Sequence, residues 1–536
     1  MPSTTMTLLL FCLTFLPLAV VDAYRVAMFA PYLSNSQVLW NKRVGEALAA
    51  ANNTVDIYML YYFEDHTHPK VDIDPRITVY TVNATMGVYG KDMHQMQGEF
   101  VYEDLSPLDS RSRRMMSFMS NMTRSCKVMV ENATLLQQIK DAKYDIAFTH
   151  MYNFCPIGLI HAAGIQSWVW LNSGALMDNV AALHGVPLPP SYCTPMMMDA
   201  GEKLTFYERI KSFIGHALFG LVWTSMVANG ETAHFRAKFG ADFPDLVDLA
   251  ADAPLVMVNS NELYDFARPT LHKIINIGGL GIKNKDAKPL KDEYAKLAAA
   301  ADGHVVFSFG SVAPAYLMPE RWLTSLLGAF AKFPRVQFFM RHEKPEEIAH
   351  LLPKNVFASK WLPQTDLLQH EKALGMVTHG GFNSIQDAIH AGTPIVTIPL
   401  FGDQPRNGHL AVKLGFGVNL HKADVVDGKV EGALQRLVSD KSLRAAAVRL
   451  REMVARKPVS AEQLLLRWTD FAVHFKRLDN LVPFGAKMNV FTYHSIDVIL
   501  FLSVVAFSVI ALLFCALRCL FRRCCCRGSA QKAKKE

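Results

Sequence analysis

The nine residues MVTHGGFNS, 376–384, decide the fold of the C-terminal half of the chain. The apolar run LGMVT (374–378) predicts a buried strand, His379-Gly-Gly the turn at its carboxyl end, and residues 382–390 the helix that follows. Glycines let the backbone approach a ligand closely, and the first turn of a helix offers free N–H groups to an anion. The unit therefore fits a phosphate site, although on these residues alone an ordinary tight turn would be the preferred interpretation.

Short apolar runs alternate with helical stretches through the rest of the chain. The N-terminal half begins with YRVAMFAPY (24–32) and a helix over 38–51, and later contains YDIAFTH (144–150) and WVWL (168–171). This alternation predicts two parallel, doubly wound sheets with a cleft between them and ligands beyond the carboxyl ends of the strands. Further strands of the C-terminal half are expected at 304–310, 336–341, 355–359 and 394–400.

Both ends of the 536-residue chain carry apolar segments that predict a membrane topology. The run 8–21, followed by VDA, predicts a signal peptide cleaved after Ala23. Residues 498–517 contain no charge and, at about 1.5 Å per residue, can span the roughly 30 Å hydrocarbon core of a membrane. The basic tail 518–536 then lies in the cytosol, and the bulk of the chain lies in the lumen.

The basic tail also accounts for all but one of the formal charge of +7, so the rest of the chain is close to neutral. A nucleic-acid partner therefore has no support. Three cysteines lie outside the signal peptide, membrane segment and tail, and they can form one disulfide at most. These cysteines are Cys126, Cys155 and Cys193, and four sequons on the predicted luminal side are Asn52, Asn83, Asn121 and Asn132.

Residues 361–405, WLPQTDLLQHEKALGMVTHGGFNSIQDAIHAGTPIVTIPLFGDQP, closely resemble the donor-binding signature of the UDP-glycosyltransferases, the family that includes the glucuronosyltransferases. A weaker resemblance covers nearly the whole chain. It implies an α/β fold of GT-B type, with two Rossmann-like domains facing a cleft, plus one C-terminal transmembrane helix. It also implies inverting transfer of glucuronic acid or glucose from a UDP-sugar to a hydroxyl of a small lipophilic acceptor.

The matching positions carry the donor contacts that the resemblance implies. Trp361 would stack on the uracil, Gln364 would bond to the nucleoside, and Asp387, where many members have Glu, would hold the ribose. A second strand-end turn, SFGS (308–311), points at the same phosphates. No metal and no cofactor is expected, because the UDP-sugar is a co-substrate. The diphosphate is expected at Gly310, Ser311, His379, Gly381, Asn383 and Ser384, and the sugar at Asp403 and Gln404.

The N-terminal half departs from the family at the position of the catalytic base. Family members have a His after the first strand and an Asp or Glu at the end of a later strand, whereas here Gln37 stands where the His belongs. Glutamine cannot take up a proton near neutral pH. The acidic position is best matched by His150, and Asn153 is a second equivalent. Either His150 is the base and Gln37 orients the acceptor, or His150 is a strand-end histidine satisfied by hydrogen bonds.

The acceptor is predicted only in outline. CTPMMMDA (193–200) and the apolar stretch 213–228 suggest an adaptable hydrophobic pocket, since methionines repack easily, although core packing explains them equally well. The altered base leaves two rival functions: a pseudoenzyme that binds nucleotide sugar and modulates active relatives, or a transferase acting on a lipid or sugar. A homo-oligomer and a hetero-oligomer with relatives both stay open. Asp72 and Asp74 are interpreted as surface charge rather than a metal site.

Lys532 and Lys534 match the dilysine retrieval signal of endoplasmic-reticulum membrane proteins. The expected location is therefore the membrane of the endoplasmic reticulum, with a single-pass type I topology and luminal catalytic domains. The expected segments are a signal peptide (1–23), an acceptor-binding Rossmann-like domain (24–265), a linker (266–290), a UDP-sugar-binding Rossmann-like domain (291–440), helices returning to the first domain (441–495), the transmembrane helix (498–517) and the basic tail (518–536).

Overall fold

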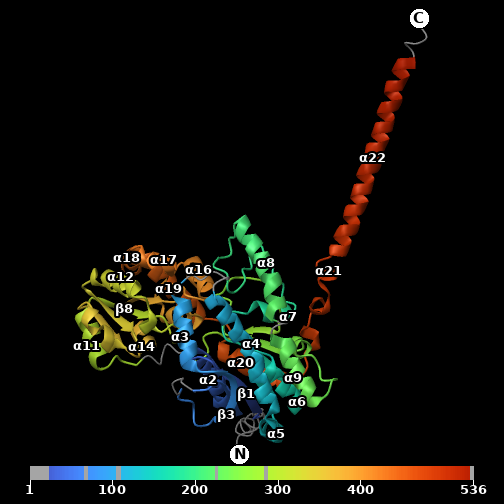
Figure 1. Cartoon of the computed structure of the whole chain (residues 1–536). Coiled ribbons are helices and arrows are strands. Elements are labelled where there is room, and N and C mark those ends of the chain that lie inside the picture. Colours follow the sequence, from blue (N-terminus) through green and yellow to red (C-terminus); the bar gives the residue numbers. More distant parts are fainter. Residues whose placement is uncertain (1–22, 66–70, 104–109, 224–226, 283–287, 531–536) are drawn as a thin grey trace, which may run out of the picture. The chain divides into compact units, whose positions relative to one another are not determined.

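The computed structural model describes residues 23–530, apart from 66–70, 104–109, 224–226 and 283–287 (Figure 1). The predicted signal peptide before Ala23 and the dilysine pattern lie outside the described residues. The chain forms two units, Met1–Val482 and Pro483–Glu536. The first unit contains both sheets, and the second contains the long C-terminal helix.

The first sheet has seven parallel strands in the order β3-β2-β1-β4-β5-β6-β7. Its central strands read as nearly continuous apolar runs because helices cover both faces of a parallel sheet. The strands are β1 (Arg25–Tyr32), β2 (Thr54–Phe63), β3 (Thr78–Val88), β4 (Ile146–His150), β5 (Trp168–Asn172), β6 (Leu255–Val258) and β7 (Ile274–Asn276).

A disulfide, Cys126–Cys155, joins two helices that follow the first three strands, and the thiol of Cys193 is free and buried. The helices of this half are α2 (Asn35–Ala50), α3 (Gly90–Val101), α4 (Ser110–Glu131), α5 (Ala133–Ala142), α6 (Cys155–Ala163), α7 (Asp178–Leu183), α8 (Phe206–Trp223), α9 (Asn229–Phe239) and α10 (Leu246–Ala251).

The second sheet has six parallel strands in the order β10-β9-β8-β11-β12-β13. The strand, turn and helix expected around the opening stretch are confirmed as β11, a turn with Gly380 at φ +81°, and α15. Its strands are β8 (Gly303–Ser308), β9 (Val336–Arg341), β10 (Val356–Ser359), β11 (Ala373–Thr378), β12 (Ile395–Thr397) and β13 (Gly417–Asn419).

Helices again cover both faces of this second sheet, because its strands are apolar on both sides. They are α11 (Asp292–Ala300), η3 (Ala315–Leu317), α12 (Glu320–Ala331), α13 (Pro345–Ile348), η4 (Ala349–Leu351), α14 (Gln364–Gln369), α15 (Phe382–Ala391), α16 (Gln404–Lys413), α17 (Lys422–Val426) and α18 (Lys429–Ser439).

The chain packs back onto the first half near the end of the first unit. Helix α19 (Lys441–Ala455) still packs on α15 of the second half. Helix α20 (Ala461–Phe475) instead contacts α2, β4 and β7 of the first half, and its first turn is fixed by a capping box between Ser460 and Gln463. The crossing therefore occurs at α20 rather than at the start of the predicted 441–495 segment.

The second unit consists of short turns, α21 (Val490–Tyr493) and the helix α22 (Ile496–Ala530). Within α22, Ile496–Arg523 is long and apolar enough to cross a membrane, and no part of its most apolar window is buried within the described structure. The predicted 498–517 segment lies within this helix, which continues into the basic residues Arg518, Arg522 and Arg523. A preceding turn, η5 (Asp479–Leu481), ends the first unit, and η6 (Phe484–Lys487) begins the second.

Candidate active site

A cavity of about 710 Å³ lies between the two halves of the first unit, at the carboxyl ends of both sheets. The first half contributes the segments after β1, β4 and β5, and the second half contributes the segments after β8, β11 and β12. This is the edge at which ligands of doubly wound sheets bind. All eleven residues expected at the UDP-sugar line it: Gly310, Ser311, Trp361, Gln364, His379, Gly381, Asn383, Ser384, Asp387, Asp403 and Gln404.

The end of the cavity where the diphosphate is expected is built around the imidazole of His379, which lies between two glycines. A Cβ atom at Gly310 would come within 2.6 Å of the His379 ring, and one at Gly381 within 2.5 Å. Gly310 also has φ +72°, which side-chain-bearing residues rarely adopt. Burial, assisted by the charge of Arg341, lowers the pKa of His379 to about 4, so the ring is neutral at pH 7.

The first turn of α15 completes this end. Gly381 is its N-cap and has no side chain to satisfy the first N–H groups, so these can turn toward an anion. Asn383 and Ser384 stand in this first turn and line the cavity. The arrangement offers a neutral imidazole, backbone N–H groups and a helix dipole to a diphosphate.

The end of the cavity where the nucleoside is expected, here called the nucleoside end, combines an exposed ring with buried polar groups. Trp361 is 65% exposed, and the guanidinium of Arg341 lies 5.3 Å from its ring centre. Gln364 donates its amide N–H to Asp387 Oδ2 over 2.8 Å. Burial raises the pKa of Asp387, against the opposing charge of Arg43.

Arg43 belongs to α2 of the first half and lines the same cavity. It was missed from the sequence, since a single arginine on the first helix carries no motif. Its side chain passes Gly281 so closely that a Cβ there would lie 3.0 Å from Arg43 Cγ. The first half thus brings a cation to the nucleoside end.

The end of the cavity where the sugar is expected lies at the start of α16, where Asp403 and Gln404 are held in fixed orientations. Asn407 donates to Asp403 Oδ2 over 2.8 Å, while burial raises the pKa of this carboxyl. Gln404 Oε1 accepts the backbone N–H groups of Leu400 and Phe401, so the side-chain NH2 is the part left for a ligand. Asp403 lies across the cavity from the first half, 3.8 Å from the position of a Cβ on Gly174.

The wall formed by the first half is largely apolar. Met196 and Met197 of the CTPMMMDA segment line the cavity, as the pocket interpretation expected. Three further methionines from distant segments join them, which the sequence pattern did not indicate. Unbranched thioether side chains adapt to ligands of different shape. The additional apolar lining residues of the first half are Leu33, Leu39, Phe63, Met122, Met151, Ala175 and Met177.

The residues proposed for the base have different positions. Gln37 lines the cavity, at the start of α2. His150 does not line it: this side chain is 2% exposed, its Nδ1 accepts the N–H of Tyr152, and its Nε2 lies 3.1 Å from the hydroxyl of Tyr62. Asn153 is also buried and donates to the same hydroxyl.

The expectation that His150 faces the cleft as a base therefore needs correction. Both ring nitrogens are engaged, and burial lowers the pKa of His150 to about 3. The geometry is that of a strand-end histidine satisfied by hydrogen bonds. Within the described part of the chain, no group of three or more His, Cys, Asp or Glu side chains is placed to hold a metal ion.

Residues 63–532 match the family model described as "UDP-glucoronosyl and UDP-glucosyl transferase". A Caenorhabditis elegans relative, ugt-48, whose name places it among the UDP-glucuronosyltransferases, is 26% identical over 525 residues, covering 95% of this chain and 97% of its own. Human UDP-glucuronosyltransferase 1A3 is 27% identical over 483 residues, covering 88% of each chain.

Solved structures share the fold at low sequence identity. A UDP-glucosyltransferase from Polygonum tinctorium superposes with a TM-score of 0.55 at 14% identity, covering 84% of this chain and 99% of its own. The calicheamicin glycosyltransferase CalG4 superposes with a TM-score of 0.53 at 16% identity, covering 86% of this chain and 100% of its own. Together with the two parallel sheets, these likenesses show the expected GT-B type fold.

Proposed function

The chain belongs to the family of UDP-glucuronosyl and UDP-glucosyl transferases, and from this premise we propose that it transfers glucuronic acid or glucose to a hydroxyl of a small lipophilic acceptor. Relatives of this family support sugar transfer from a UDP-sugar. One observation carries the finer proposal: all eleven expected donor residues line one cavity, opposite a methionine-rich wall.

In the proposed reaction, the acceptor oxygen attacks the anomeric carbon as the bond from that carbon to the β-phosphate oxygen breaks. Configuration at the anomeric carbon is inverted, and UDP leaves. His379, with the first turn of α15, would stabilise the negative charge that grows on the leaving UDP. Asp403 and Gln404 would hold the sugar hydroxyls, while Trp361 would stack on the uracil.

The acceptor proton lacks the usual family base. Gln37 lines the cavity where that base belongs and cannot take up a proton. We therefore expect acceptors that ionise readily, such as acidic phenols, to react ahead of aliphatic alcohols. The UDP-sugar would serve as co-substrate without a metal or cofactor, and Asp74 pairs with Arg76 at 2.7 Å as a surface charge would.

A second candidate function is a pseudoenzyme that binds nucleotide sugar and modulates active relatives by association. Two observations favour it: Gln37 occupies the base position, and the imidazole of His150 is buried away from the cavity. It would bind UDP in the same donor residues and transfer no sugar. A transferase acting on a lipid or sugar acceptor is the third candidate.

The proposed location is the membrane of the endoplasmic reticulum, with a type I orientation and both sheets on the luminal side. The apolar part of α22, Ile496–Arg523, supports a membrane anchor. The disulfide Cys126–Cys155 supports an oxidising compartment. The four sequon asparagines are exposed or half-buried, so a glycan could reach each of them.

The test is a transfer assay on microsomes that carry the full chain, with labelled UDP-glucuronic acid and UDP-glucose. The acceptors are graded phenols, aliphatic alcohols, a membrane lipid and a free sugar, and a His379→Ala variant is the matched blank. Labelled phenol products that His379→Ala does not form would support the proposal. Saturable UDP binding without any product would favour the pseudoenzyme, and a product from lipid or sugar alone would replace the acceptor class.

A further inference from the structure

Helix α16 carries the residues expected to bind the sugar at its start and three basic side chains along one side. Arg406, His409 and Lys413 are spaced so that they share one face of the helix. Each of these side chains meets an acid of the first half, which places the helix across the boundary between the two halves. The partners, in the same order, are Asp265, Asp199 and Glu202.

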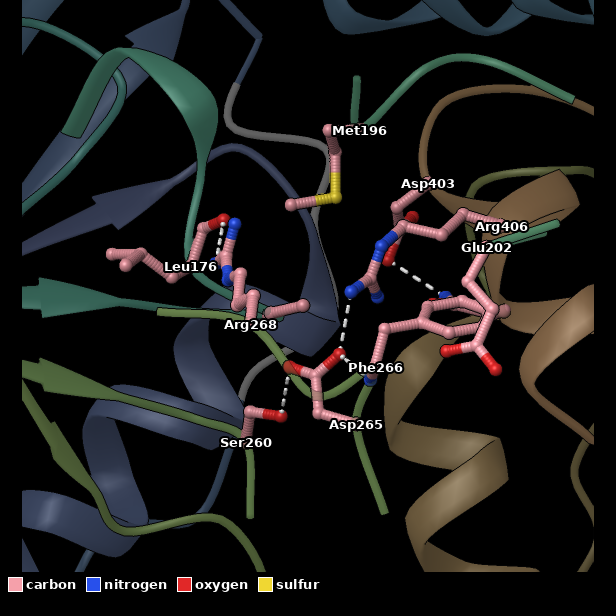
Figure 2. A network of polar contacts seen from close by, with 12 residues as sticks. Leu176, Met196, Glu202, Ser260, Asp265, Phe266, Arg268, Asp403 and Arg406 are labelled. Carbon is pink, nitrogen blue, oxygen red and sulfur yellow. Dashed lines mark hydrogen bonds and ion pairs between the residues drawn. The ribbon is translucent and has the colours of Figure 1, made fainter. Parts of the chain in front are cut away.

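The innermost of these pairs is buried. Arg406 Nη2 lies 2.5 Å from Asp265 Oδ1, and the side chains are only 5% and 15% exposed. Figure 2 shows Asp265 between the guanidinium of Arg406 and the hydroxyl of Ser260, which donates to Asp265 Oδ2 over 2.8 Å. The guanidinium also lies 4.8 Å from the ring centre of Phe266.

Asp265 is also fixed by contacts with other residues of the first half. Its Oδ1 accepts the backbone N–H of Phe266, and the charge of Arg268 lies close by. Arg268 in turn donates to the carbonyl of Leu176, in the segment that follows β5. Burial would raise the pKa of Asp265, but the charges of Arg406 and Arg268 outweigh it and keep the pKa below its usual value.

Arg406, the other member of the ion pair, lies one helical turn from Asp403, and Figure 2 shows the two side chains next to each other. Asn407, the residue after Arg406, donates to Asp403 Oδ2. Any rotation or shift of α16 would therefore move the carboxylate that faces the sugar. Asp265, which holds Arg406 and thereby α16 in place, belongs to the other half of the molecule.

We propose that Asp265 and Arg406 are positioning residues: their buried ion pair sets the start of α16, and with it Asp403 and Gln404, against the acceptor-binding half. This inference rests on the proposed function, because it assigns the donor sugar to Asp403 and Gln404. The pair acts mainly on the sugar, since the diphosphate and nucleoside residues stand on the β8, α14 and α15 segments. Helix α16 also touches the diphosphate turn, where Asn407 donates to the carbonyl of Gly380 over 3.0 Å.

The outer pair of the same face provides the matched control. Lys413 lies 2.5 Å from Glu202 and 5.0 Å from the Phe266 ring, so it also links α16 to the first half. The side chains of Lys413 and Glu202 are 31% and 33% exposed, and water strongly screens the attraction between charges that are this exposed. Lys413 also lies at the far end of α16 from Asp403.

The experiment compares the full chain in detergent with Asp265→Asn, Arg406→Lys and Lys413→Ala. It measures the affinities for UDP, UDP-glucuronic acid and UDP-glucose at equilibrium, so the readout does not require turnover. We expect Asp265→Asn and Arg406→Lys to bind UDP within about twofold of the natural chain. Their preference for the better UDP-sugar over UDP should fall about tenfold or more, while Lys413→Ala keeps it.

Several results would overturn the inference. Equal weakening of UDP and UDP-sugar by Arg406→Lys would show a general structural role, and an unchanged preference in Asp265→Asn would show no role. If Arg406→Lys fails to fold, Asp265→Asn, which keeps the side-chain shape, decides the matter alone. If the natural chain binds no UDP at all, the proposed function fails first, and that outcome differs from all of these.

Discussion

The wall of the cavity formed by the second sheet is polar, with each of its key side chains held by a neighbour. His379 fits between two glycines, Gln404 is bonded to its own loop, and Asp387 accepts from Gln364. The wall formed by the first sheet has a different character: methionines from several distant segments line it, and Gln37 stands where a base would be expected.

The difference between the two walls matches a difference in how much their expected ligands vary. A nucleotide is the same molecule in every reaction of such a protein, so fixed donors can be built for it in advance. Apolar acceptors vary in shape, and a surface of flexible thioether side chains accommodates that variation. Under the proposed function, the second half would determine that a UDP-sugar binds, and the first half would determine what receives the sugar and how fast.

The largest expected effect is on the polar wall. Gly310→Ala should reduce UDP affinity at least a hundredfold, about 2.7 kcal/mol, because the new Cβ meets His379 at 2.6 Å and the backbone has φ +72°. Isothermal titration of the folded variant measures this. Gly328→Ala, where nothing lies within 4 Å, is the control and should bind UDP normally. Normal binding by Gly310→Ala would mean that the diphosphate lies elsewhere.

The second prediction concerns the missing base on the apolar wall. Gln37→His should raise kcat for a phenol acceptor by about a hundredfold, since a positioned general base contributes at least that much. UDP affinity should not change, because Gln37 lies on the acceptor side. A pH–rate profile that gains a new limb near the ordinary pKa of histidine, about 6.5, would identify the new base. An unchanged kcat would mean that proton removal does not limit the reaction.

The third prediction uses the buried His150 of the first half, whose folded pKa of about 3 lies below the unfolded value of 6.5. The stability due to the neutral ring is complete above pH 6.5 and is lost as pH falls toward 3. When the pH is lowered from 7 to 5, the free energy of unfolding of His150→Gln should fall by about 2 kcal/mol less than that of the natural chain. Chemical denaturation at both pH values measures it. Turnover at pH 7 should survive the substitution, and its abolition would restore His150 as a catalytic residue.

The smallest effect is expected where the two walls meet. Arg43→Ala should weaken UDP binding about fivefold, roughly 1 kcal/mol, because it removes the first half's cation from the nucleoside end beside Asp387. Lys42→Ala, which breaks only the surface pair with Glu46 at 3.4 Å, is the control. Equal affinities in both variants would confine nucleotide binding to the second half.

The same contrast explains how much the sequence could predict. The strand, turn and helix around His379 follow from local periodicity and glycine chemistry. Nine of the eleven donor residues stand within residues 361–405, and the other two stand in the strand-end turn 308–311. Arg43 and Met122 reach the cavity only through the packing of helices far apart in the chain, which local patterns do not encode.

His150 shows a second limit. Its place at the end of a strand was correctly predicted, since β4 ends at this residue. The direction of its side chain depends on Tyr62, a residue of another strand, and on the backbone of Tyr152. A strand-end position identifies candidates, and only the packing around them decides which ones face the cavity.

Equilibrium binding of UDP to the full chain in detergent, with UDP-glucuronic acid and UDP-glucose as competitors, is the decisive measurement. We expect saturable UDP binding that at least one UDP-sugar displaces and that Gly310→Ala weakens at least a hundredfold. A folded chain that binds no UDP, or that binds it equally well with Ala at position 310, would contradict the assignment of this cavity to a nucleotide sugar.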